Sequence, residues 1–143
     1  MESVWITDRL GKSWKVEVDI QSDDNSQIIL VNLFILNPKI EYAFTRGYLS
    51  IMKTGKTAKI EDLVIEYPEL ENRGIGSALL NLMEAISRKI GAIKMTGELS
   101  VEDADHFGKL KYFYHKHGYR IYLKKHPDNN SAFYGRIFKS LTQ

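Results

Sequence analysis

The spacing of apolar residues changes near residue 67, and this change most limits the folds open to the chain. Before it, apolar residues alternate with polar ones, as in Trp14–Ile20, at the two-residue period of a half-buried strand. After it, a set of apolar residues follows the three- and four-residue spacing of an amphipathic helix: Ile75, Leu79, Leu82, Met83, Ile86 and Ile90. Strands followed by helices that bury one face against them are typical of an α+β fold.

Seven segments have the spacing and composition of strands, and two have those of helices. The expected strands are 14–20, 27–36, 42–52, 58–67, 92–99, 119–124 and 132–141, and the expected helices are 75–90 and 104–117. Gly91 and Gly118 suit the left-handed residue that ends a helix. No repeat or low-complexity linker divides the 143 residues, so we expect a single domain over residues 1–143.

Composition excludes several classes of site. The chain has no cysteine, which removes disulfides, a thiolate nucleophile and cysteine-based zinc sites. No segment approaches the ~20 apolar residues that span a bilayer, so we expect no membrane association. The absence of cysteine favours an intracellular setting, and we expect a cytoplasmic location. His115 and His117 are two residues apart on an expected helix and cannot face one ion, so we expect no metal site.

A basic run in the C-terminal half favours an anionic ligand. Between His106 and Pro127 there is no acidic residue, whereas the segment contains Lys109, Lys111, Lys116, Arg120, Lys124 and Lys125. Such a run suits a phosphate-bearing ligand, a nucleic acid that stacks on the interleaved aromatic residues, or simply a solvated helix face. The run alone leaves these alternatives open.

A glycine turn opens the first expected helix. The first N–H groups of a helix lack partners and carry partial positive charge, so they bind phosphate readily. Gly74 and Gly76 lack a Cβ atom and allow a ligand to lie against the backbone, and Arg73 adds a positive charge. A plain turn is the alternative. The dinucleotide fingerprint is excluded because Leu79 stands at its third glycine.

These residues resemble the GCN5-related N-acetyltransferases, abbreviated GNAT. The family motif Q/R-x-x-G-x-G/A at a helix start aligns with Glu71–Gly76. A second family landmark, a tyrosine before a lysine and a glycine-aromatic pair, aligns with Phe113–Tyr119. The two landmarks occur in the family order, with a strand between them, and the resemblance covers roughly Ala58–Leu141.

The resemblance implies a fold and a cosubstrate. The fold would be a mixed, mostly antiparallel sheet of six or seven strands, splayed between the strands ending near Tyr67 and Leu99. Acetyl-CoA would bind with its pyrophosphate on the backbone N–H groups from Gly74 through Ala78 and its pantetheine arm along the preceding strand. The implied cofactor-binding residues are Ile65, Glu66, Arg73, Gly74, Ile75, Gly76, Ser77, Ala78 and Lys116.

The resemblance also implies the chemistry. A primary amine would attack the thioester directly in a ternary complex, and Tyr114, at the family's general-acid position, would protonate the departing thiolate. A phenol of pKa about 10 can share its proton with a thiolate whose conjugate acid is near 8.5. Tyr112 is the fallback acid. Glu98 is the candidate base, with Glu61 and Glu66 as alternatives and a water relay as another route.

The chain departs from the family pattern at several positions, and one departure affects how the acceptor-binding side is built. Glu71 stands where the motif has Gln or Arg, and Phe107 where the family has Asn. Between Ile20 and Ile28 there is room only for a turn, so the two N-terminal helices of the family are reduced or absent. The acceptor side is then built differently or by a partner subunit, as in a homodimer.

We therefore expect acetyl-CoA and an amine acceptor, either a small molecule or a protein, as partners. A coenzyme A-binding module without catalysis and a nucleic-acid-binding module of the same fold are the alternatives, and nucleic acid is the less expected partner.

Overall fold

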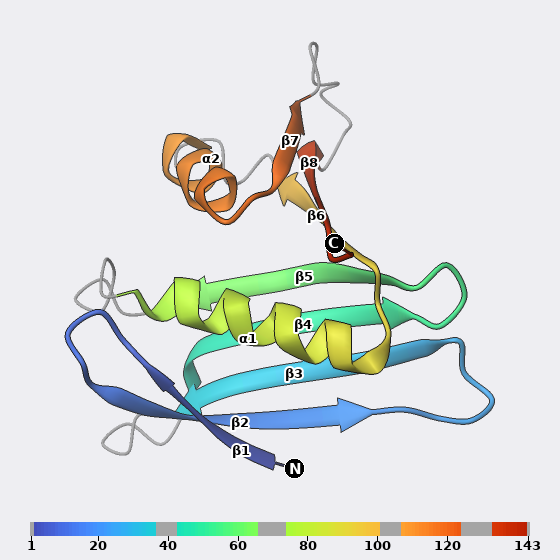
Figure 1. Ribbon diagram of the computed structural model, residues 1–143, viewed down its shortest axis with the longest axis horizontal. Coiled ribbons are helices and arrows are strands. Elements are labelled where there is room, and N and C mark those ends of the chain that lie inside the picture. The colour runs from blue at the N-terminus through green and yellow to red at the C-terminus, as the bar shows by residue number, and fades with distance from the viewer. Residues whose placement is uncertain (1, 37–42, 66–73, 101–106, 124–132, 143) are drawn as a thin grey trace.

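The computed structural model describes residues 2–36, 43–65, 74–100, 107–123 and 133–142 (Figure 1). These residues form the strands β1 (Glu2–Thr7), β2 (Ser13–Gln21), β3 (Ile28–Leu36), β4 (Ala43–Met52), β5 (Thr57–Ile65), β6 (Lys94–Ser100), β7 (Arg120–Leu123) and β8 (Phe133–Ser140), and the helices α1 (Ile75–Ile90) and α2 (Phe107–Lys116). All eight strands belong to one sheet, in the order β1-β2-β3-β4-β5-β6-β8-β7. The predicted α+β class is confirmed.

The expected number of strands was one too low because β1 was missed. Only Val4 and Ile6 of this strand turn toward the core, whereas Trp5 between them is 65% exposed. An apolar residue on the solvent side hides the two-residue alternation, and β1 lies at the edge of the sheet, where it pairs only with β2. Edge strands are held mainly by one neighbour, so their sequences carry a weak pattern.

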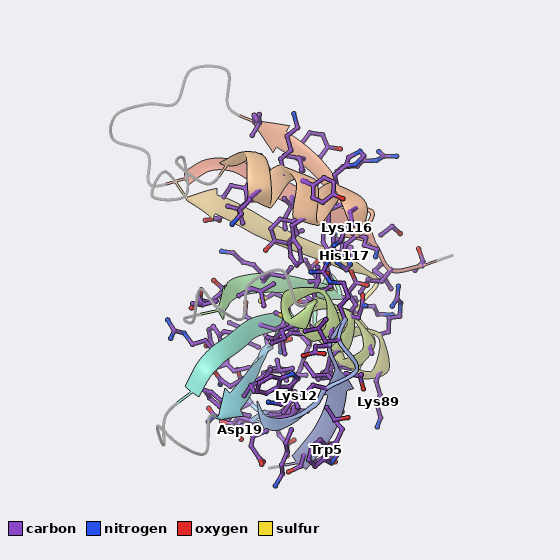
Figure 2. All side chains as sticks on the ribbon, turned by 90° about the vertical axis from the view of Figure 1, so that its left-hand side faces the viewer. Trp5, Lys12, Asp19, Lys89, Lys116 and His117 are labelled. Carbon is purple, nitrogen blue, oxygen red and sulfur yellow. The ribbon has the colours of Figure 1, made fainter. Side chains whose placement is uncertain are left out.

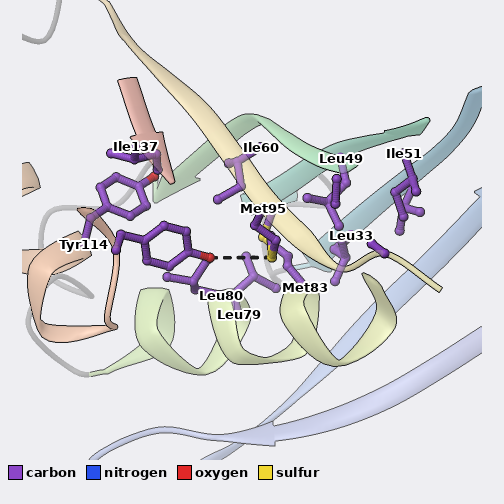
Figure 3. Close-up of a cluster of buried hydrophobic side chains, with 14 of the residues drawn as sticks. Leu33, Leu49, Ile51, Ile60, Leu79, Leu80, Met83, Met95, Tyr114 and Ile137 are labelled. Carbon is purple, nitrogen blue, oxygen red and sulfur yellow. Dashed lines mark hydrogen bonds between the residues drawn. The ribbon is translucent and has the colours of Figure 1, made fainter. Parts of the chain in front are cut away.

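Helix α1 lies lengthwise over the strands of the first half of the sheet (Figure 1). Its fully buried residues Ile75, Leu79, Leu80 and Met83 enter one core cluster with Leu33, Leu49 and Ile51 of the strands (Figure 3). The helix approaches β4 so closely at Gly47 that a Cβ atom there would lie 3.0 Å from Met83 Sδ. A glycine in β4 therefore lets α1 lie against the sheet, and this contact helps to set the position of the helix.

The sheet opens between β5 and β6, as expected for the predicted splay. These parallel strands pair only from Thr57–Lys94 to Ile60–Gly97, although β5 runs on to Ile65 and β6 to Ser100. A bulge lies at the point of divergence, because Tyr48 and Leu49 of β4 pair with Asp62 and Ile60 and leave Glu61 without a partner in the register. A bulge bends its strand and increases its twist. We call the diverging ends, residues 61–65 and 98–100, the fork.

The N-terminal half is built from strands. β2 and β3 are antiparallel neighbours on either side of residues 22–27, and the described residues contain no helix before Ile75. The expected reduction of the N-terminal helices is thus confirmed for the part of the chain that the structure describes. Within that part, neither helix is long and apolar enough to cross a membrane.

Candidate active site

The first turn of α1 presents backbone N–H donors that have no acceptor within the helix. Gly74 is its N-cap, with a left-handed φ of 81°, and in the described part of the chain no side chain caps the helix. The first four N–H groups of a helix have no intrahelical acceptor, and here these belong to Gly74 through Ser77. The Ala78 N–H already donates to the Gly74 carbonyl oxygen at 3.0 Å. The predicted donor set therefore reduces to four residues.

The β1–β2 turn packs against this helix start. A Cβ atom at Gly74 would lie 3.3 Å from Arg9 Cβ, which is tighter than most real contacts. The turn is held from inside by the buried Asp8 carboxylate, which accepts hydrogen bonds from the Leu10 and Lys12 N–H groups, both at 2.9 Å, and from Trp14 Nε1 at 3.0 Å. A rigid turn thus fixes the position of the N-cap.

We expect Gly74→Ala to lower the free energy of unfolding by more than Gly11→Ala does. Both glycines have left-handed φ values, 81° and 84°, which cost an alanine about 1 kcal/mol. A Cβ at Gly11 meets nothing within 4 Å, so the difference between the two variants isolates the contact with Arg9. Urea denaturation measures both losses. Equal losses would contradict the proposed packing.

A hydrogen bond joins α1 to the end of α2. His117 directly follows Lys116, the last residue of α2, and both are labelled in Figure 2. Its Nε2 atom lies 2.9 Å from Ser77 Oγ, and its ring centroid lies 5.0 Å from that of Phe113. Burial, assisted by the positive charges of Lys116 and Lys139 and opposed by Glu84, lowers the pKa of His117 below its ordinary 6.5. This contact could not be predicted from the sequence, because no linear pattern pairs residues 77 and 117.

A buried acid holds the same end of α2 in place. Glu84 of α1 accepts a hydrogen bond from Tyr119 Oη at 2.9 Å, and Lys139 Nζ reaches both of its carboxylate oxygens, at 3.0 and 3.1 Å. Lys139 Nζ also donates to the His117 carbonyl oxygen at 2.7 Å. Burial and the Glu84 carboxylate raise the pKa of Tyr119, so its hydroxyl stays protonated. These contacts tie α1, the end of α2 and β8 together.

Tyr114 lies in the core near the fork. It is 7% exposed and makes edge-to-face contacts with Phe113 and Tyr119, at centroid distances of 5.1 and 5.5 Å. Figure 3 shows its ring beside Ile137 of β8, whose strand partner Gly97 is the last residue of β6 that pairs with β5. Tyr112, the fallback acid, is 72% exposed and lies outside this cluster.

Glu98 lies on the other side of the sheet from Tyr114. Met95, Gly97 and Leu99 of β6 are buried toward the core, so Glu98, which alternates with them, points the opposite way and is 52% exposed. Its carboxylate lies 3.2 Å from Lys59 Nζ, which also lies 3.7 Å from the carboxylate of Glu61. The two candidate bases therefore approach one lysine at the base of the fork, and neither shares a face with Tyr114.

The remaining predicted site residues are placed only in part. Ile65 is the last residue of β5 and pairs with Thr45 of β4, beyond the last pair that β5 forms with β6. Lys116 is exposed at the end of α2, with Nζ 5.9 Å from the Tyr112 ring. Glu66 and Arg73 lie outside the described residues, as does Glu71. Among the residues that the structure describes, no three His, Asp or Glu side chains group as metal ligands.

Solved structures share this fold. The GNAT domain of S. lividans PAT matches with a TM-score of 0.69 over 96% of each chain, at 12% identity. An acetyltransferase from Bacillus cereus ATCC 14579 matches with a TM-score of 0.60 at 23% identity, over 84% of this chain and 79% of its own. The fold is that of the GNAT acetyltransferases.

A spermidine N-acetyltransferase chimera that contains Vibrio cholerae sequence also has this GNAT fold. Its TM-score is 0.57 at 15% identity, over 78% of this chain and 68% of its own. No protein-family model and no curated protein matches the sequence. The likeness is therefore one of fold.

Proposed function

We propose that this protein is an N-acetyltransferase that uses acetyl-CoA as cosubstrate and moves its acetyl group to a primary amine. The observation that carries the proposal is the pairing of two features in one GNAT fold. One is a helix start with four donor N–H groups and no acidic residue in its first turn, and the other is a fork in the sheet beside it. The first suits a pyrophosphate and the second suits an extended thioester arm.

The cofactor would run from the helix start into the fork. Its pyrophosphate would accept hydrogen bonds from the N–H groups of Gly74, Ile75, Gly76 and Ser77, with Arg73 as a further cation. The pantetheine amides would pair with β5 near Ile65 and Glu66, where β5 no longer pairs with β6. Lys116 would contact the 3′-phosphate from the end of α2.

The reaction would proceed by direct attack in a ternary complex. The neutral amine forms a bond to the thioester carbonyl carbon, the C–S bond then breaks, and the thiolate takes a proton from Tyr114. The ammonium proton leaves to Glu98 or through water. The products are an N-substituted acetamide and coenzyme A. Because Tyr114 and Glu98 lie on opposite faces of the sheet, the thioester would lie between them and the acceptor would approach from the Glu98 side.

An amine acceptor suits the charge at that side. Glu98 and Glu61 both approach the ammonium group of Lys59, so two carboxylates face one lysine at the base of the fork, and the excess negative charge would attract a cationic amine. The spermidine N-acetyltransferase chimera acts, by its name, on such an amine. Small polyamines and protein amino groups are both acceptors of this chemistry, and a second copy of the chain would complete the acceptor side.

The test has two arms, binding and turnover. Acetyl-CoA at 100 times its Kd should add about 2.7 kcal/mol to the free energy of unfolding and raise Tm by about 5 to 10 °C. Release of free thiol from acetyl-CoA is then followed over a panel of polyamines, amino acids and peptides. Binding with no turnover on any amine would favour a non-catalytic coenzyme A module. Absence of stabilisation would overturn the proposal.

A further inference from the structure

Ser77 occupies the third position of α1, within the turn that would receive the pyrophosphate. Its hydroxyl has one proton to donate and can accept hydrogen bonds at its oxygen. The imidazole of His117 lies 2.9 Å from that oxygen, so the two residues form a direct contact across the two helices. The orientation of the Ser77 proton then depends on which partner donates.

An anion at the helix start selects one of the two orientations. If Ser77 donated to His117, the lone pairs of its oxygen would face the phosphate and repel it. If His117 donates from Nε2, the Ser77 proton is free to turn toward a phosphate oxygen, and hydrogen bonds to charged groups are the stronger ones. His117 can donate from Nε2 in two states, as a neutral ring with its proton on Nε2 or as a charged ring with protons on both nitrogens.

Two contacts hold the His117 ring in position beside Ser77, and neither has a role in the proposed acetyl transfer. Its backbone carbonyl accepts from Lys139 Nζ at 2.7 Å, and Lys139 is itself anchored on the buried Glu84. The ring packs on Phe113. Such outside support reduces the entropy lost when a ligand binds.

We propose that His117 is a positioning residue of the cofactor site, which donates from Nε2 to Ser77 Oγ and directs the Ser77 hydroxyl proton to the pyrophosphate of coenzyme A. This inference rests on the proposed function. The contact between His117 and Ser77 would link binding of coenzyme A at the start of α1 to the position of the end of α2. Tyr114 lies one turn earlier on that helix.

The charge of His117 adds a dependence on pH. In the described part of the chain, the charged groups that act on it are Glu84 of α1, Lys116 of α2 and Lys139 of β8, and together with burial they lower the pKa of the unliganded ring below 6.5. A bound pyrophosphate stabilises the charged ring and so raises this pKa. Binding then takes up a proton, and affinity rises as the pH falls through the interval between the two values.

The test measures the Kd of coenzyme A by calorimetry for the wild type, His117→Leu, His117→Gln and Ser77→Ala. Leucine keeps an apolar contact with Phe113 but cannot donate, whereas glutamine keeps an N–H donor near the place of Nε2 and does not titrate. At pH 8 we expect His117→Leu and Ser77→Ala to bind about tenfold more weakly, and His117→Gln to bind like the wild type. The double variant His117→Leu with Ser77→Ala should be no weaker than either single variant.

The pH series separates a positioning role from a merely structural one. Between pH 8 and pH 5.5 the affinity of the wild type should rise relative to that of His117→Gln, which corrects for titration of the coenzyme A phosphates. Unchanged affinity in His117→Leu, or losses that simply multiply in the double variant, would overturn the inference. If His117→Leu does not fold, the Kd of Ser77→Ala and the pH dependence of binding in His117→Gln test the inference instead. Failure of the wild type to bind coenzyme A overturns the proposed function itself, whereas binding that no variant affects overturns this inference alone.

Discussion

Gly76→Asp is expected to abolish binding of acetyl-CoA and to leave the protein folded. Gly76 is the second residue of α1, so the new carboxylate would lie where the proposed site would hold the pyrophosphate oxygens. Two unit charges 4 Å apart repel by about 4 kcal/mol at an effective dielectric constant of 20. That energy corresponds to roughly a thousandfold rise in Kd. An acid in the first turn also favours the helix dipole, so the fold should not suffer.

The matched control is Gly76→Asn, which adds the same bulk without the charge. We expect its Kd for acetyl-CoA to lie between those of the wild type and Gly76→Asp, and isothermal titration calorimetry measures all three. Circular dichroism and thermal unfolding show whether each variant is folded. An unchanged affinity in Gly76→Asp would remove the helix start from the cofactor site.

The helix that carries this site was predictable because local chemistry fixes both of its ends. The apolar stripe predicted 75–90, and the structure has α1 at Ile75–Ile90. Gly74 and Gly91 flank it with φ values of 81° and 112°, which side chains other than glycine rarely adopt. The apolar spacing and the two flanking glycines all belong to α1 or adjoin it. Its bounds could therefore be predicted without knowledge of tertiary contacts.

The features that the sequence did not predict depend on contacts between distant residues. The bond between Ser77 and His117 joins residues 40 positions apart, and the hydrogen bond between Glu84 and Tyr119 spans 35. A pattern of apolar residues specifies which face of an element is buried, but not which polar groups meet there. For the same reason, the opposite faces of Tyr114 and Glu98 became visible only when α2 was placed against the sheet.

The second prediction of large effect concerns Tyr114 as the proposed proton donor. Tyr114→Phe should keep the affinity for acetyl-CoA and lower kcat by one or more orders of magnitude, because general acid catalysis contributes about 10²- to 10⁴-fold. The ring contacts with Phe113 and Tyr119 remain in the variant, so the fold should be kept. Steady-state rates of thiol release on the best acceptor measure the loss.

Tyr112→Phe is the matched control for this variant. It removes a hydroxyl from the same helix at a position that is 72% exposed, against 7% for Tyr114, and we expect it to keep full activity. A loss only in Tyr114→Phe therefore identifies the proton donor rather than a general effect on α2. Full activity in Tyr114→Phe would mean that another group or water protonates the thiolate. Tyr114 would then contribute only to the packing of the hydrophobic core. Tyr114 is 7% exposed and belongs to the hydrophobic core cluster, so little of it is open to water, which favours a loss of activity in Tyr114→Phe.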